Sequence, residues 1–385
     1  MIFQHNHCKI FYLTMNVYFY SFKLKSDKIY MRNYGNDNKS AFDAKSEAQK
    51  LAFAAIAFQA VKSLRDLGIL SVIEESRRNG LTVDEVAEKV NLPRYGVLVL
   101  LEAGLSNNVV WLKDDKYILT KTGHFILNDT LTKVNMDFTN DVCYEGMFKL
   151  EDSIRYGKPA GLKVFGEWET IYEGLSQLPE KVKKSWFDFD HYYSDLVFPY
   201  ALEYVFRNEP KKIMDVGGNT GKWAITCCKH NASVNVTILD LPGQLVMAQK
   251  NIDKNGFTDR ITGHPLNLLD HSKPFPKGHD VIWMSQFLDC FGEDDILQLL
   301  IRAAEALDEK GALFINETYW DKQKFESATY SLHHTSLYFT ALANGTSRMY
   351  HSDDMRELVD RAGMKVVDEI DDMGVSHTIL KCMKK

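Results

Sequence analysis

Two stretches decide the fold of this chain, Ile213-Met-Asp-Val-Gly-Gly-Asn-Thr-Gly221 and Val234-Asn-Val-Thr-Ile-Leu-Asp-Leu-Pro242. The first is an apolar strand that runs into a glycine-rich turn, and the second is an apolar strand that ends at Asp240. A parallel βαβ unit of this layout brings a ligand close to the backbone at the glycines and offers a carboxylate to ribose hydroxyls. The pattern therefore predicts a cofactor that contains adenosine. An α/β domain without a nucleotide is the plainer interpretation, and the position of Asp240 disfavours it.

The spacing of the glycines separates the candidate cofactors. Gly217, Gly218 and Gly221 do not match the G-x-G-x-x-G of dinucleotide sites, and Gly221-Lys-Trp223 lacks the upstream glycine of a P-loop. Asp215 stands just before the turn, where it would repel a phosphate. S-adenosylmethionine carries a sulfonium and an ammonium group, so its positive charge suits this carboxylate. We therefore expect this cofactor.

Composition bounds the class of protein. A chain of 385 residues with 45% hydrophobic and 25% charged residues predicts two globular domains. The net charge of -6 argues against nucleic acid as the main partner. The six cysteines show no CxxC or Cys/His metal spacing, which favours a reducing cytoplasm and no bound metal. No apolar run reaches the length of about 18 residues that a membrane span needs, so we expect no membrane partner.

The chain divides into four segments by pattern. Residues 1–43 resemble a leader, of which residues 1–30 are either an upstream-start artefact or a peripheral extension. Residues 44–130 predict a winged-helix domain, residues 131–208 amphipathic helices that line a substrate pocket, and residues 209–385 an α/β domain. Its strand candidates are 212–216, 234–240, 260–265, 279–287, 311–318, 364–370 and 376–383. The last two have no helix between them, which predicts an antiparallel hairpin at the edge of a seven-stranded sheet.

The winged-helix pattern consists of three helices and a hairpin. Its helices are expected at 48–66, 82–90 and 95–106, and its strands at 109–112 and 117–120. Winged helices commonly bind DNA, but the third helix contains no Lys or Arg with which to neutralise phosphates. Its apolar run is better explained by burial against another subunit. We therefore expect a homodimer and no nucleic acid.

From residue 44 to 385 the chain resembles class I S-adenosylmethionine-dependent small-molecule O-methyltransferases. In this family, which includes the caffeate, acetylserotonin and bacterial natural-product enzymes, an N-terminal winged helix serves dimerisation. The resemblance implies a Rossmann-like methyltransferase domain, a homodimer and methyl transfer to a small aromatic or polyketide-like acceptor, at oxygen or at a ring carbon. It rests on Leu67-Gly-Ile-Leu70, Leu81-Thr-Val-Asp-Glu-Val-Ala87, Tyr117-Ile-Leu-Thr120, Asp215-Val-Gly-Gly-Asn-Thr-Gly221, Leu239-Asp-Leu-Pro242, Phe314-Ile-Asn-Glu317 and Arg361-Ala-Gly-Met364.

The same resemblance implies roles for the cofactor residues. Gly217 and its neighbours would face the methionine part of the cofactor, and Asp240 would face the ribose. Leu241 would pack on the adenine. Asn267-Leu268 stands where the family usually has Asp-Phe or Asp-Met beside the adenine, and Ser285 stands where a Lys often lies.

The catalytic segment departs from the family. Members that methylate phenols typically read His-Asp-Trp, with the His as general base, where this chain reads Asp289-Cys290-Phe291. The first supporting glutamate is kept as Glu317, and Met349 replaces the second. An aspartate near pKa 3.9 is about six units too weak to hold the proton of a phenol near pKa 10. Asp289 could also be the N-cap of a helix over 292–307.

Three routes around this mismatch are open. Asp289 and Glu317 could share a proton, which would raise the pKa of the pair. His191, on a helix face with Phe187 and Asp195, or His333 or His334 could be the base. A third possibility is an acidic acceptor that is already ionised and needs no base. We expect the acceptor pocket to include Tyr144, Phe187, His334 and Met349.

Two other functions stay open. The absence of the usual His and of the second Glu is compatible with a cofactor-binding protein that has lost methyl transfer. A winged-helix regulator that senses S-adenosylmethionine is the other, and the lack of cations on 95–106 disfavours it.

Overall fold

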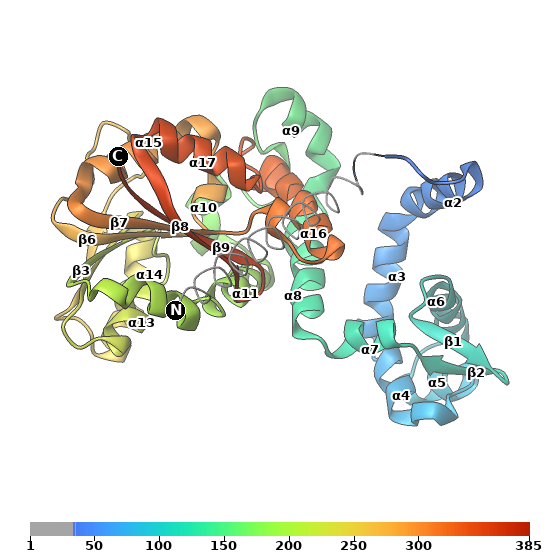
Figure 1. Ribbon diagram of the computed structural model, residues 1–385. Coiled ribbons are helices and arrows are strands. Elements are labelled where there is room, and N and C mark those ends of the chain that lie inside the picture. The colour runs from blue at the N-terminus through green and yellow to red at the C-terminus, as the bar shows by residue number, and fades with distance from the viewer. Residues whose placement is uncertain (1–33, 35) are drawn as a thin grey trace, which may run out of the picture. The chain divides into compact units, whose positions relative to one another are not determined.

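The computed structural model describes residue 34 and residues 36–385 (Figure 1). The chain divides into two compact units, of which the first ends at Asn128 and the second begins at Asp129. The predictions for residues 1–30 lie outside the described residues. The expected leader ends earlier than predicted, because Ser40 caps a helix that begins at Ala41. In the described part of the chain, no helix is long and apolar enough to cross a membrane.

The first unit contains the predicted helices and hairpin. Its elements are α2 (Ala41–Ala52), α3 (Ala54–Asp66), α4 (Ile69–Ser76), α5 (Val83–Val90), α6 (Arg94–Ser106), β1 (Val110–Lys113), β2 (Lys116–Leu119) and α7 (Lys121–Asn128). The start of α5 is fixed by a capping box, in which Thr82 and Glu85 bond each other's backbone. The helix predicted over 48–66 is two helices that meet at Phe53, and α4 was not predicted.

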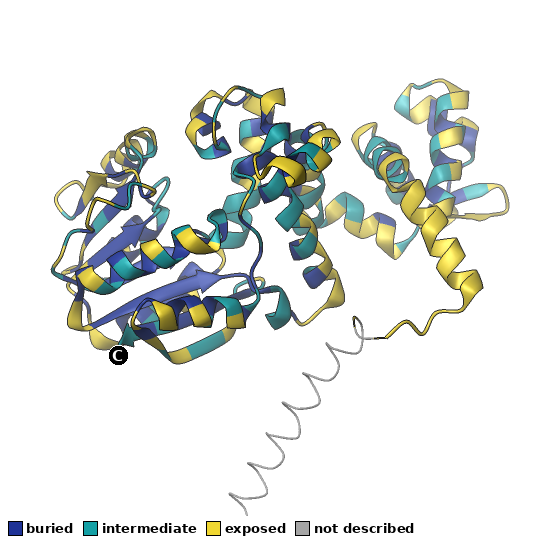
Figure 2. Cartoon of the chain, turned by 90° about the horizontal axis from the view of Figure 1, so that it is seen from above, coloured by how far each residue is buried: buried dark blue, intermediate teal, exposed yellow. Residues whose placement is uncertain are grey.

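Only some of the apolar side chains of the first unit are buried in its core. Val97 and Leu101 of α6 are buried in it, whereas Tyr95 on the same helix is 77% exposed. The apolar run of α6 is therefore explained in part by packing within the chain. By contrast, α2 has no buried residue, and Figure 2 shows it as an exposed helix.

The second unit is built on one seven-stranded sheet of order β5-β4-β3-β6-β7-β9-β8. Five neighbouring strands are parallel, and β9 is antiparallel to both β7 and β8, which confirms the predicted closing hairpin. The strands are β3 (Lys212–Val216), β4 (Asn235–Asp240), β5 (Ile261–Pro265), β6 (His279–Ser285), β7 (Leu307–Glu317), β8 (Met364–Met373) and β9 (His377–Lys384).

Helices cover both faces of this sheet (Figure 1). Successive strand residues point to opposite faces, so Met214 and Met284 pack in one core and Ile213 and Trp283 in the other. The first core includes α15 (Glu293–Ala306) and α17 (Ser352–Arg361), and the second includes α12 (Phe198–Val205), α13 (Lys222–His230) and α14 (Pro242–Asn255).

A third core joins the helices before the sheet to those after β7. Its main helices are α8 (Thr130–Phe138), α9 (Leu150–Tyr156), α10 (Ile171–Gly174), α11 (Glu180–Asp195) and α16 (Glu326–Tyr338). One long helix was predicted from 178 to about 206, but α11 ends at Asp195 and α12 starts at Phe198. Pro199 opens α12 and cannot continue a preceding helix, which explains the break.

Short helical turns connect these elements. They are η1 (Arg77–Asn79), η2 (Thr139–Cys143), η3 (Gly146–Lys149), η4 (Ala160–Val164), η5 (Leu175–Gln177), η6 (Phe206–Asn208), η7 (Leu288–Cys290), η8 (Trp320–Lys322) and η9 (Phe339–Ala343).

A histidine on β9 makes the second unit sensitive to acid. His377 is fully buried, and within the described chain neither of its ring nitrogens has a hydrogen-bond partner. Burial lowers the pKa of this imidazole to about 3. Because the unfolded chain takes up the proton near pH 6.5, the folded state loses stability as the pH falls from there toward 3 and is unaffected above that window.

We predict that His377→Gln removes about 2 kcal/mol of the loss of unfolding free energy between pH 7 and pH 5. Urea unfolding at the two pH values measures this difference, which is independent of any change in stability that the variant causes at pH 7. The exposed His264 on β5 gives the control variant His264→Gln. Equal losses for His377→Gln and the parent chain would contradict the prediction.

Candidate active site

The turn after β3 is tied to the end of β4 by one carboxylate. Asp240 accepts the backbone N–H of Asn219 at 2.8 Å and that of Leu241 at 2.7 Å. The N–H of Gly217 donates to the carbonyl of Leu239 at 2.9 Å. Burial raises the pKa of Asp240 to about 6, although the two N–H bonds oppose this change. The glycine turn and the carboxylate that were predicted to share a ligand therefore lie together.

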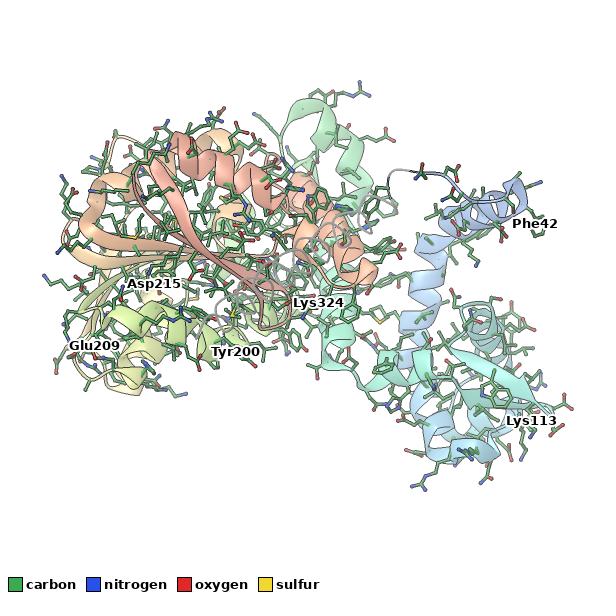
Figure 3. The ribbon with its side chains drawn as sticks, viewed as in Figure 1. Phe42, Lys113, Tyr200, Glu209, Asp215 and Lys324 are labelled. Carbon is green, nitrogen blue, oxygen red and sulfur yellow. The ribbon has the colours of Figure 1, made fainter. Side chains whose placement is uncertain are left out.

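The turn requires glycine, because of its backbone conformation and because side chains pack closely against it. Gly217 and Gly221 have φ values of +72° and +76°, which favour glycine. A Cβ on Gly218 would lie 2.6 Å from the Oδ2 atom of Asp215. Among the described residues this buried Oδ2 has no hydrogen-bond partner. Burial, followed by the charge of Asp240, raises the pKa of Asp215 to about 8. Asp215, labelled in Figure 3, is thus a buried acid next to bare backbone, and S-adenosylmethionine fits this combination.

The residues expected beside the adenine lie in two loops at the same edge of the sheet. Leu241 precedes α14, and Leu268 is buried in the loop after β5. Asn267 is exposed, and its side-chain oxygen accepts the N–H of Leu269 at 3.0 Å, so the amide oxygen is engaged within its own loop. Ser285, at the end of β6, accepts a hydrogen bond from Asn316 at 2.8 Å.

A buried arginine holds the loop after β5. Arg302 of α15 donates to the carbonyls of Leu268, Asp270 and Lys273, the last two at 3.2 and 3.1 Å. Its guanidinium lies 4.6 Å from the centre of the Phe275 ring. Sequence reasoning missed Arg302, because a single cation within an amphipathic helix gives no sign that it turns inward.

The catalytic segment is held by Glu317. Its Oε1 atom accepts the N–H groups of Phe287 and Leu288 at 3.0 and 2.8 Å. Asp289 lies in η7 and is 6% exposed, whereas the N-cap of α15 is Gly292, so the N-cap alternative for Asp289 is wrong. Burial raises the pKa of Asp289 to about 6. Burial, and then the charge of Asp289, holds the pKa of Glu317 well above its usual range.

His191 on α11 lies between two carboxylates. Its Nδ1 atom is 3.7 Å from Asp190 and 3.8 Å from Asp195, and its ring stacks on Phe187 with a centroid distance of 5.7 Å. Burial and the charge of Lys222 lower the pKa of His191, so the imidazole is neutral near pH 7.

Asp190 is a site residue that sequence reasoning missed. The side-chain N–H of Asn219 in the glycine turn donates to its Oδ2 atom at 3.4 Å. Burial, followed by the charges of Asp289 and Asp195, raises the pKa of Asp190 to about 7. The carboxylate therefore lies between the cofactor turn and the catalytic segment. Helical periodicity grouped Phe187 and His191 on one face of α11, and Asp190 does not belong to that pattern.

The other predicted pocket residues differ in position. Met349 is buried, and its sulfur accepts the hydroxyl of Thr318 at 3.5 Å, next to Glu317. Tyr144 is half-buried after η2. His334, which was predicted for the pocket, is exposed, and its Nδ1 atom lies 2.7 Å from the carbonyl of Tyr330 on its own helix, so the structure does not bring it to the other predicted pocket residues.

Aromatic side chains pack near η7. The indole N–H of Trp186 donates to the hydroxyl of Tyr338 at 2.8 Å, which joins α11 to α16. Tyr172 of α10 interacts with Cys290, the residue after Asp289. Such side chains suit a flat acceptor.

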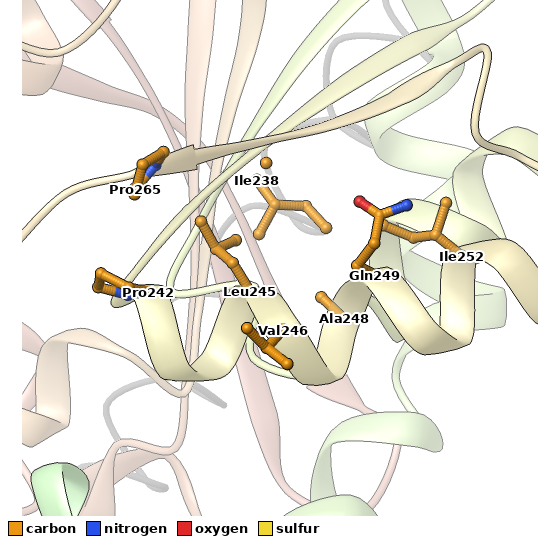
Figure 4. A pocket seen from close by; sticks show the side chains of 9 residues that line it. Ile238, Pro242, Leu245, Val246, Ala248, Gln249, Ile252 and Pro265 are labelled. Atoms are coloured by element: carbon orange, nitrogen blue, oxygen red, sulfur yellow. The ribbon is translucent and has the colours of Figure 1, made fainter.

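An apolar groove of about 340 Å³ lies elsewhere, between α14 and the edge strand β5 (Figure 4). No residue predicted for the cofactor or the acceptor lines it, and it offers no carboxylate. Its lining side chains belong to Ile238, Pro242, Leu245, Val246, Ala248, Gln249, Ile252 and Pro265. We do not assign the chemistry to this groove.

We predict that Gly218→Ala weakens the binding of S-adenosylhomocysteine at least about tenfold, or about 1.4 kcal/mol. The added Cβ would force Asp215 to move, because it would lie 2.6 Å from the Asp215 carboxylate. Calorimetric titration measures the affinity. Gly243→Ala on α14 is the matched control, since a Cβ there meets nothing within 4 Å. Equal affinities of the two variants would rule out the role given to Gly218.

Known proteins match both units. Residues 45–117 match the Dimerisation2-like domain family, and residues 147–365 match the O-methyltransferase domain family. The chain is 25% identical over 317 residues to the L-tyrosine C(3)-methyltransferase of Streptomyces lavendulae, covering 81% of this chain and 85% of that protein.

Two solved structures share the fold. The S-adenosylmethionine-dependent methyltransferase SibL in its apo form gives a TM-score of 0.68 at 23% identity, over 88% of this chain and 99% of that chain. The O-methyltransferase NcsB1 from neocarzinostatin biosynthesis, in complex with S-adenosylmethionine and 2-hydroxy-5-methyl naphthoic acid, gives 0.59 at 19% identity, over 86% and 96%. Because the second family match spans more than half of the 385 residues, this chain belongs to the O-methyltransferase domain family and is an S-adenosylmethionine-dependent methyltransferase.

Proposed function

We propose that this enzyme methylates a small aromatic or polyketide-like acceptor, at a phenolic or carboxylate oxygen or at a ring carbon activated by a hydroxyl group. The observation that carries the proposal is the position of Asp289 and Glu317, after β6 and at the end of β7, among aromatic side chains. The L-tyrosine C(3)-methyltransferase and NcsB1 with its naphthoic acid are compatible with an aromatic acceptor. Membership of the family disfavours both a regulator and a protein that has lost methyl transfer.

The chain's own residues would hold the two reactants next to each other. Asp240 would face the ribose, and Asp215 and the glycine turn would face the positively charged methionine part. When bound, S-adenosylmethionine supplies an electrophilic methyl group on its sulfonium. Transfer of this group needs proximity and an in-line approach more than strong acid–base chemistry.

The proton of a phenolic acceptor would go to Asp289. Burial raises the pKa of Asp289 to about 6, which narrows the gap to a phenol from about six units to about four. Glu317 accepts the N–H groups of Phe287 and Leu288 and thereby holds the backbone that carries Asp289. His191 is the second candidate base, because its imidazole is neutral near pH 7 and lies beside Asp190.

Mass spectrometry of reactions with phenols, hydroxycinnamates and aromatic acids tests the function through a product that is heavier by one methylene. We expect Asp289→Asn to lower kcat about 100-fold or more, as the loss of a general base does, while the affinity for S-adenosylhomocysteine is kept. In the parent enzyme the rate should fall as the pH drops through about 6, where Asp289 takes up a proton, and the variant should lack this limb. A large loss in His191→Ala with an unchanged Asp289→Asn would make His191 the base.

We infer that the first unit joins two copies of this chain. Its match to the Dimerisation2-like domain family supports this, as do the exposed apolar side chains of α2, where Phe42 is 82% and Leu51 72% exposed. Side chains of this kind are normally covered in a folded assembly.

We predict that the double variant Phe42→Glu/Leu51→Glu shifts the chain from dimer to monomer, because two charges would have to be desolvated in the interface. Light scattering after size-exclusion chromatography measures the mass. Val246→Glu, an exposed position on α14, serves as the control. A double variant that remains dimeric at micromolar concentration would place the interface outside α2.

A further inference from the structure

Several polar groups meet around the thiol of Cys290, at the end of η7. Asp289, Glu317 and Asp190 all act electrostatically on this thiol, together with the hydroxyl of Tyr172. The three carboxyl groups come from α11, η7 and β7, which are distant in the sequence. Proton transfer to Asp289 involves Asp289 and its support from Glu317, and it assigns no role to Asp190.

The cluster contains little positive charge of its own. Among the described residues, the cation that acts on Asp190 is Lys222, and its Nζ atom is bonded to Asp195 at 2.7 Å. The hydrogen bond that Asp190 accepts comes from the neutral amide of Asn219 at 3.4 Å. The Nδ1 atom of His191 lies 3.7 Å from Asp190, beyond hydrogen-bond distance, and the Asp190 side chain is 25% exposed. Asp190 therefore has lone pairs that a ligand entering from solvent can reach.

Glu317 gives an independent sign that a ligand is expected here. This residue is 2% exposed, and its Oε1 atom is held by the backbone of Phe287 and Leu288. Its Oε2 atom is buried without a partner in the described structure, and Asp289 is the charged neighbour that acts on it most strongly. A buried oxygen without a hydrogen-bond donor lowers the stability of the folded state, unless a ligand supplies the donor.

We propose that the acceptor is an aromatic compound that carries an ammonium group, and that Asp190 binds this group while the reacting atom faces Asp289. The proposal rests on the proposed function and narrows it. An ammonium supplies three donors and one positive charge, which matches a site of three carboxyl groups whose neighbouring cation, Lys222, is bonded to Asp195. A carboxylic acid acceptor would add a further negative charge and would be disfavoured. The alternative is that Asp190 interacts with the positive charge of the cofactor and not with an ammonium group of the acceptor.

Calorimetry on the full-length enzyme saturated with S-adenosylhomocysteine tests this proposal without turnover. The probes are tyramine, N-acetyltyramine, which has lost the ammonium charge, and 3-(4-hydroxyphenyl)propionate, which is an anion. We expect tyramine to bind at least about tenfold more tightly than N-acetyltyramine. Asp190→Asn should remove this preference, whereas Asp190→Glu should restore part of it. The control Asp188→Asn changes an exposed carboxylate of the same helix, which pairs with Lys184, and should keep the preference.

Three results would overturn the proposal. The first is that tyramine fails to bind, the second is that tyramine binds no more tightly than N-acetyltyramine, and the third is that the preference for tyramine survives in Asp190→Asn; each of these results contradicts the proposal. If Asp190→Asn weakens S-adenosylmethionine but not S-adenosylhomocysteine, and the preference for tyramine persists, Asp190 faces the sulfonium instead. Failure of S-adenosylhomocysteine to bind the parent enzyme would be a failure of the proposed function and not of this inference alone.

Discussion

The bonds from Asn219 and Leu241 to the carboxylate of Asp240 are the constraint on which the rest of the site depends. They lock the turn after β3 against the end of β4, so the glycines open at the edge of the sheet where ligands of α/β proteins bind. The same bonds keep Asp240 buried beside Asp215, and the pKa of both carboxyl groups is raised. A cation that enters this edge relieves the cost of burying two acids, and therefore the fold favours a positively charged cofactor.

Much of the fold could be predicted because its signals are local. The glycine turn requires positive φ at Gly217 and Gly221, and only a few residue types tolerate this conformation. The apolar strands and the missing helix before the last strand predicted the sheet with its closing hairpin. In the first unit, the helix expected at 82–90 is α5 over Val83–Val90, and Thr82 is its N-cap in a capping box with Glu85.

The rest of the candidate site depends on tertiary contacts that no local pattern carries. Asp190 becomes important because α11 approaches the cofactor turn through Asn219, and helical periodicity does not reveal that approach. Arg302 looks like a surface cation until the loop after β5 folds over it. The same reasoning placed His334 in the pocket because it favoured a titratable residue, although the rotation of α16 turns this side chain to solvent.

An aspartate base, as proposed for Asp289, would create a different distribution of charge from the one that a histidine base creates. A neutral imidazole that takes the acceptor's proton becomes a cation as the sulfonium charge disappears, so the positive charge only moves. With Asp289 as the proposed base, the carboxylate would instead become neutral at the same moment, so two opposite charges would vanish together. In a poorly hydrated pocket, a step that removes charge is helped more than one that relocates it. Burial therefore acts twice at Asp289, because it raises the pKa of the carboxyl group and favours the neutral products. A carboxylate can serve where its pKa in water alone would exclude it, provided that the pocket stays closed to water.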